Sequence, residues 1–540
     1  MSRLPHGNAP AAALAHFALT ALAIAAAWWW LGRPVQIPPS PLADGGKFYC
    51  LSYAPFRPDQ DPLIETTHVD AQQIDEDLTL LSRYTDCIRT YSVDSGQDQI
   101  AAVAQRHGMH VLQGIWLSHD VQKNRQQITT GVALAKQYPD VIRALVVGNE
   151  VLLRGDLSVT DLEADIRAVK AQVTQPVTYA DVWEYWLRYS DLQNAVDFVT
   201  IHILPYWEDF PIPADGAAAH VEAIRNKVAA AIPNKDIVVG EFGWPSEGRM
   251  REGARPSPSN QARAIAETLA LAQREKFRVN IIEAFDQPWK RQLEGATGGY
   301  WGVIDRATGA PKFDASGAVS DHPQWPIAAA AGILLAAAAF AAAAVAGRGK
   351  AAPPFLWVRV TALTFLPAVL LGWTIERVPI DSFTAGGWLH ALAFAMTAVA
   401  APIVCAAACA AGRRAPAFGA ALSRQTPALD GLGLALGLCL IALTVLSVQT
   451  ALGLVFDPRY RDLSFAPQSA AVMPFLVLAL VTPRRFETRA IAESVAAVVL
   501  ALSAIYIAFD ETFANWQAIW LCAGLLALAV TLARARAVPG

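Results

Sequence analysis

Two glutamates, Glu150 and Glu241, stand where carboxylates can do chemistry. Each stands where a short apolar run with β-branched residues stops: Glu150 ends Ala144–Glu150, and Glu241 follows the first four residues of Ile237–Trp244. Such runs predict buried parallel strands, and the carboxyl ends of strands in a closed barrel open onto one face. Two carboxylates about 5–5.5 Å apart are the working pair of a retaining glycosidase. The sequence therefore predicts Glu150 as general acid/base and Glu241 as nucleophile.

A single glutamate at a strand end is more often a salt-bridge or helix-capping residue. Here two such residues lie about ninety positions apart, with Asn149 before one and Phe242-Gly-Trp-Pro245 after the other. Together they favour catalysis. Asn149 is expected to bind the sugar 2-hydroxyl, whose hydrogen bond strengthens in the transition state.

The elements that must position these residues alternate between strand-like and helix-like patterns. Helical patterns separate most pairs of strands, for example at Asp70–Tyr84 and Asn260–Glu275, and the whole alternation covers about 275 residues. This predicts an α/β fold, a (β/α)₈ TIM barrel. A doubly wound open sheet would need a Gly-rich phosphate turn after an early strand, which the sequence lacks. The predicted strands are Phe48–Phe56, Cys87–Tyr91, His110–Leu117, Ala144–Glu150, Pro176–Asp181, Val196–Trp207, Ile237–Trp244 and Val279–Trp289.

The motifs around the two glutamates resemble those of a known family. Val147–Glu150 and Val239–Ser246 are similar to the acid/base and nucleophile signatures of glycoside hydrolase family 17, the β-1,3-glucanases. The resemblance covers roughly residues 48–315 and implies a retaining mechanism and a β-glucan substrate. Phe242, Gln287 and Pro288 depart from the plant-type pattern, which puts linkage specificity in doubt. Further similar segments are Cys87–Tyr91, His202–Trp207, Ile282–Asp286 and Tyr300–Val303.

Other residues at predicted strand ends are expected to touch the substrate or Glu241. Tyr206 would donate a hydrogen bond to Glu241 or else be a core tyrosine, and about half of the barrel tryptophans should be core residues. The loop Asp181–Trp186 is a candidate acceptor platform. Neither a metal nor a cofactor is expected. The predicted substrate-binding residues are Asn149, Arg89, Tyr91, Tyr206, Trp244, Glu283, Asp286 and Trp289.

Hydrophobic residues make up 54% of the 540 residues but are unevenly placed. From Pro326 onward the chain is mostly Ala, Leu, Val and Ile, with charges in short loops, as in a multi-span membrane domain. We expect a transmembrane anchor at 1–34 (a cleaved signal peptide is the alternative), a linker at 35–46, the barrel at 47–323 and an all-α membrane domain at 326–536. The expected spans are 326–346, 355–375, 387–410, 429–450, 468–482, 490–508 and 516–533.

Basic residues occupy every second gap between these spans, which predicts that those gaps face the cytoplasm. The barrel would then lie outside the cytoplasm. The basic residues are Arg348 and Lys350, then Arg413, Arg414 and Arg424, then Arg484, Arg485 and Arg489, then Arg534 and Arg536.

Charge and cysteine usage add two constraints. A net charge of −4 and the lack of a basic stripe argue against nucleic acid as a partner. Cys50 and Cys87 lie on the first two predicted strands, so they would form a disulfide in an oxidising compartment or remain as two buried thiols.

The whole architecture resembles bacterial membrane-bound β-(1→6)-glucan synthases. We therefore expect a transglycosylase that remodels periplasmic β-glucan, using a β-1,3-linked donor and forming β-1,6 linkages or branches. A membrane-anchored endo-β-1,3-glucanase and a non-catalytic glucan-binding or export scaffold are the alternatives. The expected partners are a β-glucan, the lipid bilayer and a glucan synthase or exporter.

Overall fold

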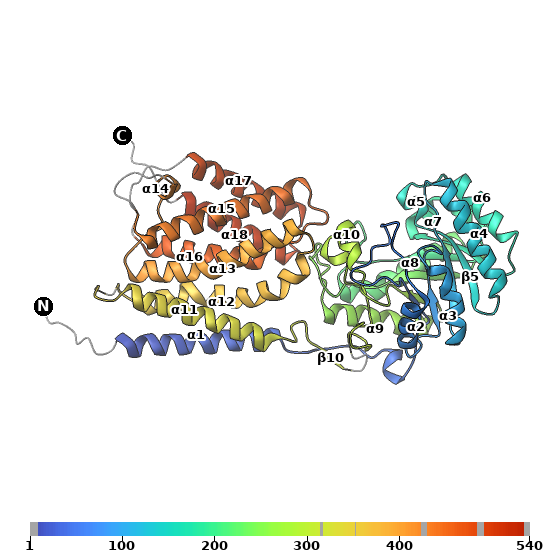
Figure 1. Ribbon diagram of the computed structural model, residues 1–540, viewed down its shortest axis with the longest axis horizontal. Coiled ribbons are helices and arrows are strands. Elements are labelled where there is room, and N and C mark those ends of the chain that lie inside the picture. The colour runs from blue at the N-terminus through green and yellow to red at the C-terminus, as the bar shows by residue number, and fades with distance from the viewer. Residues whose placement is uncertain (1–8, 314–316, 352, 423–428, 483–490, 534–540) are drawn as a thin grey trace. The chain divides into compact units, whose positions relative to one another are not determined.

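A computed structural model describes the chain apart from residues 1–8, 314–316, 352, 423–428, 483–490 and 534–540 (Figure 1). It contains two compact units. One comprises Pro34–Gly248 and Gly253–Val319, and the other comprises Met1–Arg33, Arg249–Glu252 and Ser320–Gly540. We call them the barrel and the helical unit.

The barrel is closed and parallel, with its eight strands in the order β2 to β9. All eight predicted strands are present, and the (β/α)₈ prediction is confirmed. Several predicted strands extend beyond the observed ones. The largest difference is at Val279–Trp289, where β9 ends at Ile281. The strands are β2 (Cys50–Ser52), β3 (Cys87–Arg89), β4 (His110–Ile115), β5 (Ile142–Asn149), β6 (Val177–Val182), β7 (Val199–His202), β8 (Ile237–Phe242) and β9 (Arg278–Ile281).

Helices follow the barrel strands, and several begin at side-chain caps. Asp70 accepts a hydrogen bond from the Gln73 backbone N–H at the start of α2, and Ser257 accepts from Asn260 at the start of α9. Such caps satisfy backbone N–H groups that have no partner within the helix. The main helices are α2 (Ala71–Leu81), α3 (Ile100–Arg106), α4 (Val121–Gln137), α5 (Val151–Arg154), α6 (Val159–Lys170), α7 (Trp183–Arg188), α8 (Ala217–Ala231), α9 (Pro258–Glu275) and α10 (Arg291–Gly298).

Side chains alternate along much of the barrel strands, with register shifts that interrupt the alternation on β5 and β8. On β5, Leu145 and Val147 belong to the apolar core cluster, whereas Ala144 and Val146 line the inside of the barrel. On β7, Val199 and Ile201 belong to the core cluster and Thr200 lines the inside. Because successive strand residues face opposite sides, the apolar core lies between strands and helices, while the inside carries small and polar residues.

Cys50 on β2 and Cys87 on β3 form a disulfide between adjacent strands. Of the two alternatives that the sequence left open, the structure has the bonded one. The other four cysteines are free and lie on apolar helices of the helical unit: Cys405, Cys409, Cys439 and Cys522.

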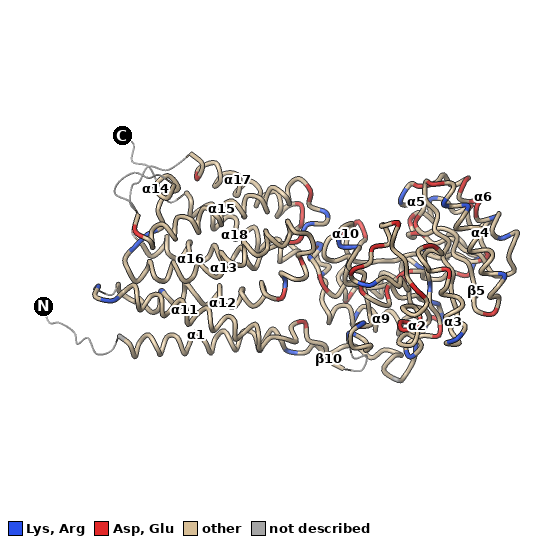
Figure 2. The backbone as a smooth tube through the Cα atoms, in the orientation of Figure 1, with Lys and Arg blue, Asp and Glu red and all other residues tan. Residues whose placement is uncertain are grey.

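The helical unit contains seven helices that are long and apolar enough to cross a membrane, among the residues that the structure describes. An eighth, α16 (Phe465–Val481), is apolar but shorter. Figure 2 shows these helices almost free of charge along their middles. The seven are α1 (Ala9–Leu31), α11 (Trp325–Ala346), α12 (Leu356–Asp381), α13 (Ala385–Ala410), α15 (Gly431–Phe456), α17 (Ile491–Asp510) and α18 (Trp516–Ala533).

Basic residues of the predicted cytoplasmic gaps fall beyond helix ends where they are described. Arg348 and Lys350 follow α11, and Arg413 and Arg414 follow α13. The other basic residues that predict the cytoplasmic gaps lie outside the described residues: Arg424, Arg484, Arg485, Arg489, Arg534 and Arg536.

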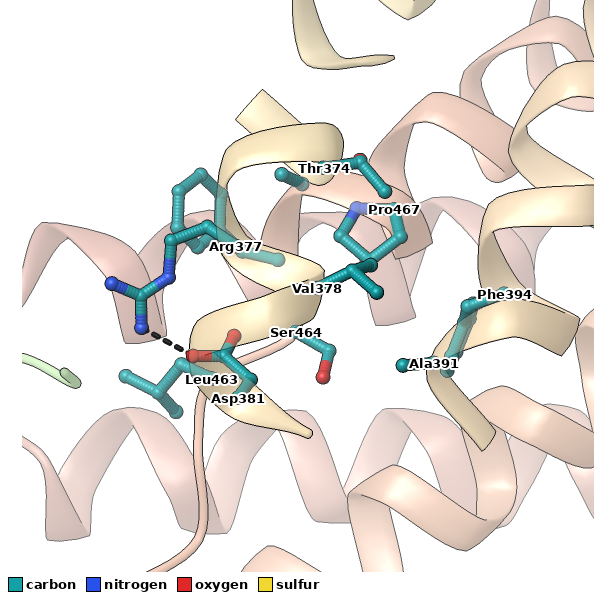
Figure 3. Close-up of a pocket in the computed structure, with 11 residues that line it drawn as sticks. Thr374, Arg377, Val378, Asp381, Ala391, Phe394, Leu463, Ser464 and Pro467 are labelled. Atoms are coloured by element: carbon teal, nitrogen blue, oxygen red, sulfur yellow. Dashed lines mark hydrogen bonds and ion pairs between the residues drawn. The ribbon is translucent and has the colours of Figure 1, made fainter. Parts of the chain in front are cut away.

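The helical unit has a small pocket beside the end of α12 (Figure 3). Phe394 of α13 and Ser464 line it, and Arg377 pairs with Asp381 at 2.5 Å along one side. Its volume of about 30 Å³ is close to the share of one water in the liquid. This pocket therefore cannot hold a sugar ring.

Candidate active site

Glu150 lies at a sharp turn between β5 and α5. Its φ of 53° is in the left-handed region, and Gly148 just before it has a φ of 85°. The Glu150 backbone N–H donates to the Ala180 carbonyl at 2.8 Å, and its carbonyl accepts from the Arg154 N–H at 2.9 Å. A non-glycine residue held in this conformation is characteristic of functional sites, since the surroundings must enforce it.

Glu241 approaches Glu150 from β8. Its side chain is 5% exposed, whereas that of Glu150 is 22% exposed. One oxygen of each carboxylate and one ring nitrogen of His202 all lie within 4.8 Å of one another. The structure thus brings together the two glutamates from strands β5 and β8, which are the fourth and seventh strands of the barrel.

Arg89, the last residue of β3, connects several of the predicted site residues. Its guanidinium donates to Glu241 Oε1 and, at 2.5 Å, to Asn149 Oδ1. It also lies 4.2 Å from the ring centroid of Tyr91, whose hydroxyl donates to Glu241 Oε1 at 2.9 Å. Arg89 and Tyr91 therefore hold one oxygen of Glu241, and Asn149 is engaged by Arg89 through its carbonyl oxygen.

His202 is a site residue that the sequence reasoning did not single out. Its Nδ1 lies 2.7 Å from Glu150 Oε1 and 3.7 Å from Glu241 Oε2. His202 is the last residue of β7, so it ends its strand as Asn149 and Arg89 end theirs. That position was a usable signal, because strand-end residues share one face of the barrel.

The charges around Glu241 decide its protonation. Burial alone would raise its pKa, but the nearby His202, Arg89 and Lys290 outweigh burial and hold the pKa below its ordinary value. Burial likewise would lower the pKa of His202, yet Glu241 and Glu150 raise it overall. The site therefore favours an ionised Glu241 beside a positively charged or readily charged imidazole.

Glu283 and Asp286, which follow β9, are each paired with a lysine. Lys290 Nζ donates to Glu283 Oε2 at 2.7 Å, and burial raises the pKa of Glu283 to about 7 despite this pairing. Asp286 accepts from Lys312 at 2.7 Å and from the Gly302 N–H at 2.9 Å, contacts that hold loops together. The positive charge of Lys290 also lowers the pKa of Glu241. No motif in the sequence indicated Lys290 as a site residue.

Three aromatic residues that were predicted to bind substrate have different surroundings. The Tyr206 hydroxyl lies 3.2 Å from Thr297 Oγ1 inside the core, while the tyrosine that donates to Glu241 is Tyr91. Trp244 is a correction: it is fully buried in the core cluster and donates to the Arg255 carbonyl at 3.1 Å, so it offers no face to a sugar. Trp289 is partly buried and donates to Gln287 Oε1 at 2.9 Å.

The loop after β6 divides into a core part and a surface part. Trp186 is buried and donates to the Thr200 carbonyl at 2.8 Å. Trp183 is half-buried and donates to Glu208 at 3.2 Å. Burial, with Glu208 and Asp209 nearby, raises the pKa of Glu184 to about 7. Four residues of this loop are partly exposed, namely Val182, Trp183, Glu184 and Tyr185.

Glu150, His202 and Glu241 are also residue types that bind metals, and their donor atoms are close enough to share an ion. Arg89, however, already places a positive charge against Glu241. A bound cation beside this guanidinium would be electrostatically disfavoured. That the site works without metal stays a prediction.

A closed (β/α)₈ barrel that brings two glutamates together at the ends of its strands, one held by an arginine and the other by a histidine, has the features of barrel glycoside hydrolases. Residues 50–302 match the family model described as the BtgE/BtgC glycoside hydrolase domain. The match covers just under half of the chain and coincides with the barrel. The barrel thus resembles the family 17 enzymes, as its motifs indicated.

Known proteins similar to this chain carry names consistent with that family. Glucan 1,3-beta-glucosidase of Schizosaccharomyces pombe is 28% identical over 40% of this chain and 72% of its own length. Probable family 17 glucosidase SCW10 of Saccharomyces cerevisiae is 26% identical over 43% of this chain and 60% of its own length. The structure of a family 17 beta-1,3-glucanosyltransferase from Rhizomucor miehei is 23% identical, covers 49% of this chain and 97% of its own, and superposes with a TM-score of 0.42.

Proposed function

We propose that this protein is a membrane-bound retaining β-glucan transglycosylase, with Glu150 as general acid/base and Glu241 as nucleophile. The observation that carries the proposal is the convergence of the two carboxylates within 4.8 Å, with Arg89 holding one of them ionised. The separation suits a retaining rather than an inverting pair, because inversion needs roughly 6.5–9.5 Å to admit a water.

The contacts assign a task to each carboxylate oxygen. Glu241 Oε1 is occupied by Arg89 and Tyr91, which leaves Oε2 to attack the anomeric carbon. Glu150 Oε1 contacts His202 Nδ1, which leaves Oε2 to carry the proton. In the first step this proton passes to the glycosidic oxygen, the C–O bond breaks, and Glu241 becomes an ester of the donor sugar.

The second step resolves the ester. A hydroxyl of an acceptor sugar attacks the anomeric carbon, Glu150 takes the hydroxyl proton, and the bond to Glu241 breaks. Both carboxylates then return to their starting states. Water in place of the acceptor would give hydrolysis by the same residues, and the names of the 1,3-β-glucosidase relatives keep this as the second candidate. Trp183 and Glu184 are proposed to bind the acceptor.

The helical unit supports a membrane setting for this reaction. Seven long apolar helices suit a bilayer, and the Cys50–Cys87 disulfide suits an oxidising compartment outside the cytoplasm. We propose a periplasmic barrel on a bacterial inner membrane, remodelling β-glucan beside a glucan synthase or exporter. The donor is a β-1,3-glucan, and β-1,6 linkage or branch formation is the proposed outcome.

Ionisable groups within the helical unit favour an anchor or platform over a transporter. Asp430 caps α15 and pairs with Arg413 at 2.6 Å, so it lies at a helix end. His390 Nε2 lies 3.2 Å from the Thr450 hydroxyl, and Glu493 accepts from the Phe418 N–H at 3.2 Å in the first turn of α17. Transport paths usually contain charged groups at the middle of the membrane. Because Asp430 and Glu493 lie at helix ends instead, we favour an anchor or platform.

The full-length protein incubated with a reduced β-1,3-glucan oligomer tests the proposal. Products longer than the starting chain, increasing with acceptor concentration, are the expected result. Linkage analysis of those products then tests the β-1,6 bond. If only shorter sugars form at every acceptor concentration, the protein is a hydrolase. If Glu241→Ala leaves glucan-dependent function intact, the barrel is a binding scaffold.

A further inference from the structure

A second cavity lies inside the barrel, toward the amino-terminal ends of the strands, whereas the two glutamates lie at the carboxyl ends. It holds about 370 Å³ and opens between the amino-terminal ends of the strands. Charged residues surround this opening: Arg143, Asp197, Asp236 and Arg278. Arg89 lines the cavity too and also contacts Glu241, so the cavity reaches the far side of the catalytic residues.

The cavity exists because small and polar residues stand among the apolar side chains on the inner faces of the strands, where Leu112, Val146 and Val238 also line it. Barrel interiors are normally filled by layers of bulky branched side chains. Here Ala144, Thr178, Thr200 and Gly240 occupy inward positions, and the Thr178 and Thr200 hydroxyls lie 2.9 Å apart. Apolar cavities stay empty, whereas cavities lined by polar groups hold water that satisfies those groups.

Two buried polar atoms beside the cavity lack a partner among the residues that the structure describes. They are His202 Nε2 and Asn280 Oδ1, in side chains that are each about 1% exposed. Asn280 lines the cavity, and its Nδ2 donates to the Gly240 carbonyl at 2.7 Å. His202 lies against the same glycine, because a Cβ on Gly240 would be 3.4 Å from His202 Nε2. Unpartnered buried polar atoms are costly and require a ligand.

We propose that this cavity is a built water site, in which solvent entering at the amino-terminal opening hydrogen-bonds His202 Nε2 and Asn280 Oδ1. At about 30 Å³ per molecule the cavity holds roughly a dozen waters. His202 is then a positioning residue held on two sides, by this water through Nε2 and by Glu150 through Nδ1. Hydration of Nε2 sustains the charged imidazole that faces the two carboxylates.

Four groups from different strands govern this imidazole. Glu150 at the end of β5 and Glu241 on β8 favour its positive charge, and Arg89 of β3 opposes it. Asp181 on β6 also interacts with it electrostatically. Removing the water would leave the imidazolium without a partner for Nε2 and so favour the neutral ring. Glu241 would then lose part of the positive potential that keeps it ionised.

Ala144→Leu in the full-length protein tests this, because the larger side chain projects into the cavity and displaces part of its water. We expect the acid limb of the kcat/KM profile to move to higher pH by about one unit, which is about tenfold in activity on that limb. The matched control is Val147→Leu, which enlarges a core-facing residue of the same strand. It should reduce stability and leave the pH profile unchanged. If Ala144→Leu does not fold, Val146→Ile takes its place.

A structure of the full chain at a resolution that shows ordered water provides the second readout. Density within hydrogen-bond distance of both His202 Nε2 and Asn280 Oδ1 is expected. A dry cavity would overturn the inference, and so would an unchanged profile in a variant whose structure lacks the water at His202 Nε2. The kinetic readout rests on the proposed function, but the water density does not. A wild-type protein without activity would therefore contradict the proposed function and leave the water site to be tested by the structure.

Discussion

The barrel site and the helical unit both bury polar side chains, but several threonines of the helical unit are satisfied in a different way. In the barrel, Arg89 and His202 end their strands and bond to carboxylates that come from other strands, and Lys290 bonds to Glu283 in the irregular segment after β9. In the helical unit, Thr364 and Thr444 donate to the backbone carbonyl four residues earlier in their own helix. A helix supplies a local acceptor, whereas a strand end does not, so side chains there pair with one another.

This difference places the chemistry in the barrel. Groups that pair across strands shift each other's pKa and can exchange protons, and such groups mark functional sites. Groups that pair within one helix are isolated from each other. If the comparison is right, the same kind of substitution should have very different effects in the two regions.

Replacing the nucleophile should have the largest effect. Glu241→Ala removes the atom that forms the ester, so we expect kcat to fall by at least about 10³-fold with little change in folding. The initial rate on a β-1,3-glucan oligomer measures this. Glu163→Gln, on an exposed face of α6, is the matched control and should keep full activity. Substantial activity in Glu241→Ala would contradict the role of Glu241 as the nucleophile.

Replacing the proton donor should have a large effect that depends on the leaving group. Glu150→Gln should lower the rate on a glucan by about 10²–10⁴-fold. An aryl glucoside with an acidic phenol leaves without protonation, so formation of the ester should be much less affected. Rapid-mixing measurement of phenol release compares the two substrates. Equal losses on both would contradict the role of Glu150 as proton donor.

Removing the buried cation should combine loss of activity with a change in pH dependence. Arg89→Met leaves Glu241 buried without its ion pair, which we expect to lower kcat/KM by about 100-fold. The pKa of Glu241 should rise, which moves the acid limb to higher pH. Arg89→Lys, which keeps the charge but loses the contact to Asn149, should lie between wild type and Arg89→Met.

The same pair makes a signed prediction for stability. Because the pKa of Glu241 is lowered in the folded state, its contribution is fully present above the unfolded-state pKa of about 4.3 and is lost as the pH falls through the folded-state value. Chemical denaturation should therefore show a larger gap between wild type and Arg89→Met at pH 7 than near pH 3. A gap that grows as the pH falls would contradict the lowered pKa.

A polar substitution in the helical unit should do much less. Thr444→Val removes one hydroxyl that bonds its own helix, so the free energy of unfolding should change by about 1 kcal/mol or less. We expect kcat to stay at the wild-type value. A loss of activity comparable to that of Arg89→Met would show that the two regions are not separable in this way.

Metal removal should have the smallest effect. Treatment with a chelator should leave kcat unchanged, because the positive charge at Glu241 comes from Arg89. Loss of activity that a divalent cation restores would instead assign the Glu150–His202–Glu241 cluster to a metal.

Much of the fold could be predicted from the sequence because apolar runs and helical periodicity repeat eight times in the barrel. Glu150 and Glu241 were identifiable because each ends such a run. Trp244 could not be placed, since a tryptophan next to a catalytic residue suits either a sugar or the core. Lys290 follows β9 in an irregular segment, where no periodic pattern indicates which way its side chain points. The interior cavity depends on which residues of every strand face inward together, which no single segment reveals.

The stereochemistry of the first product tests the paired action of Glu150 and Glu241 most directly. Proton NMR of the anomeric signal, recorded in the first minutes of a reaction with a β-1,3-glucan oligomer, distinguishes the two outcomes before mutarotation mixes them. We expect the new reducing end or linkage to appear first as the β anomer. An α product formed first would contradict it.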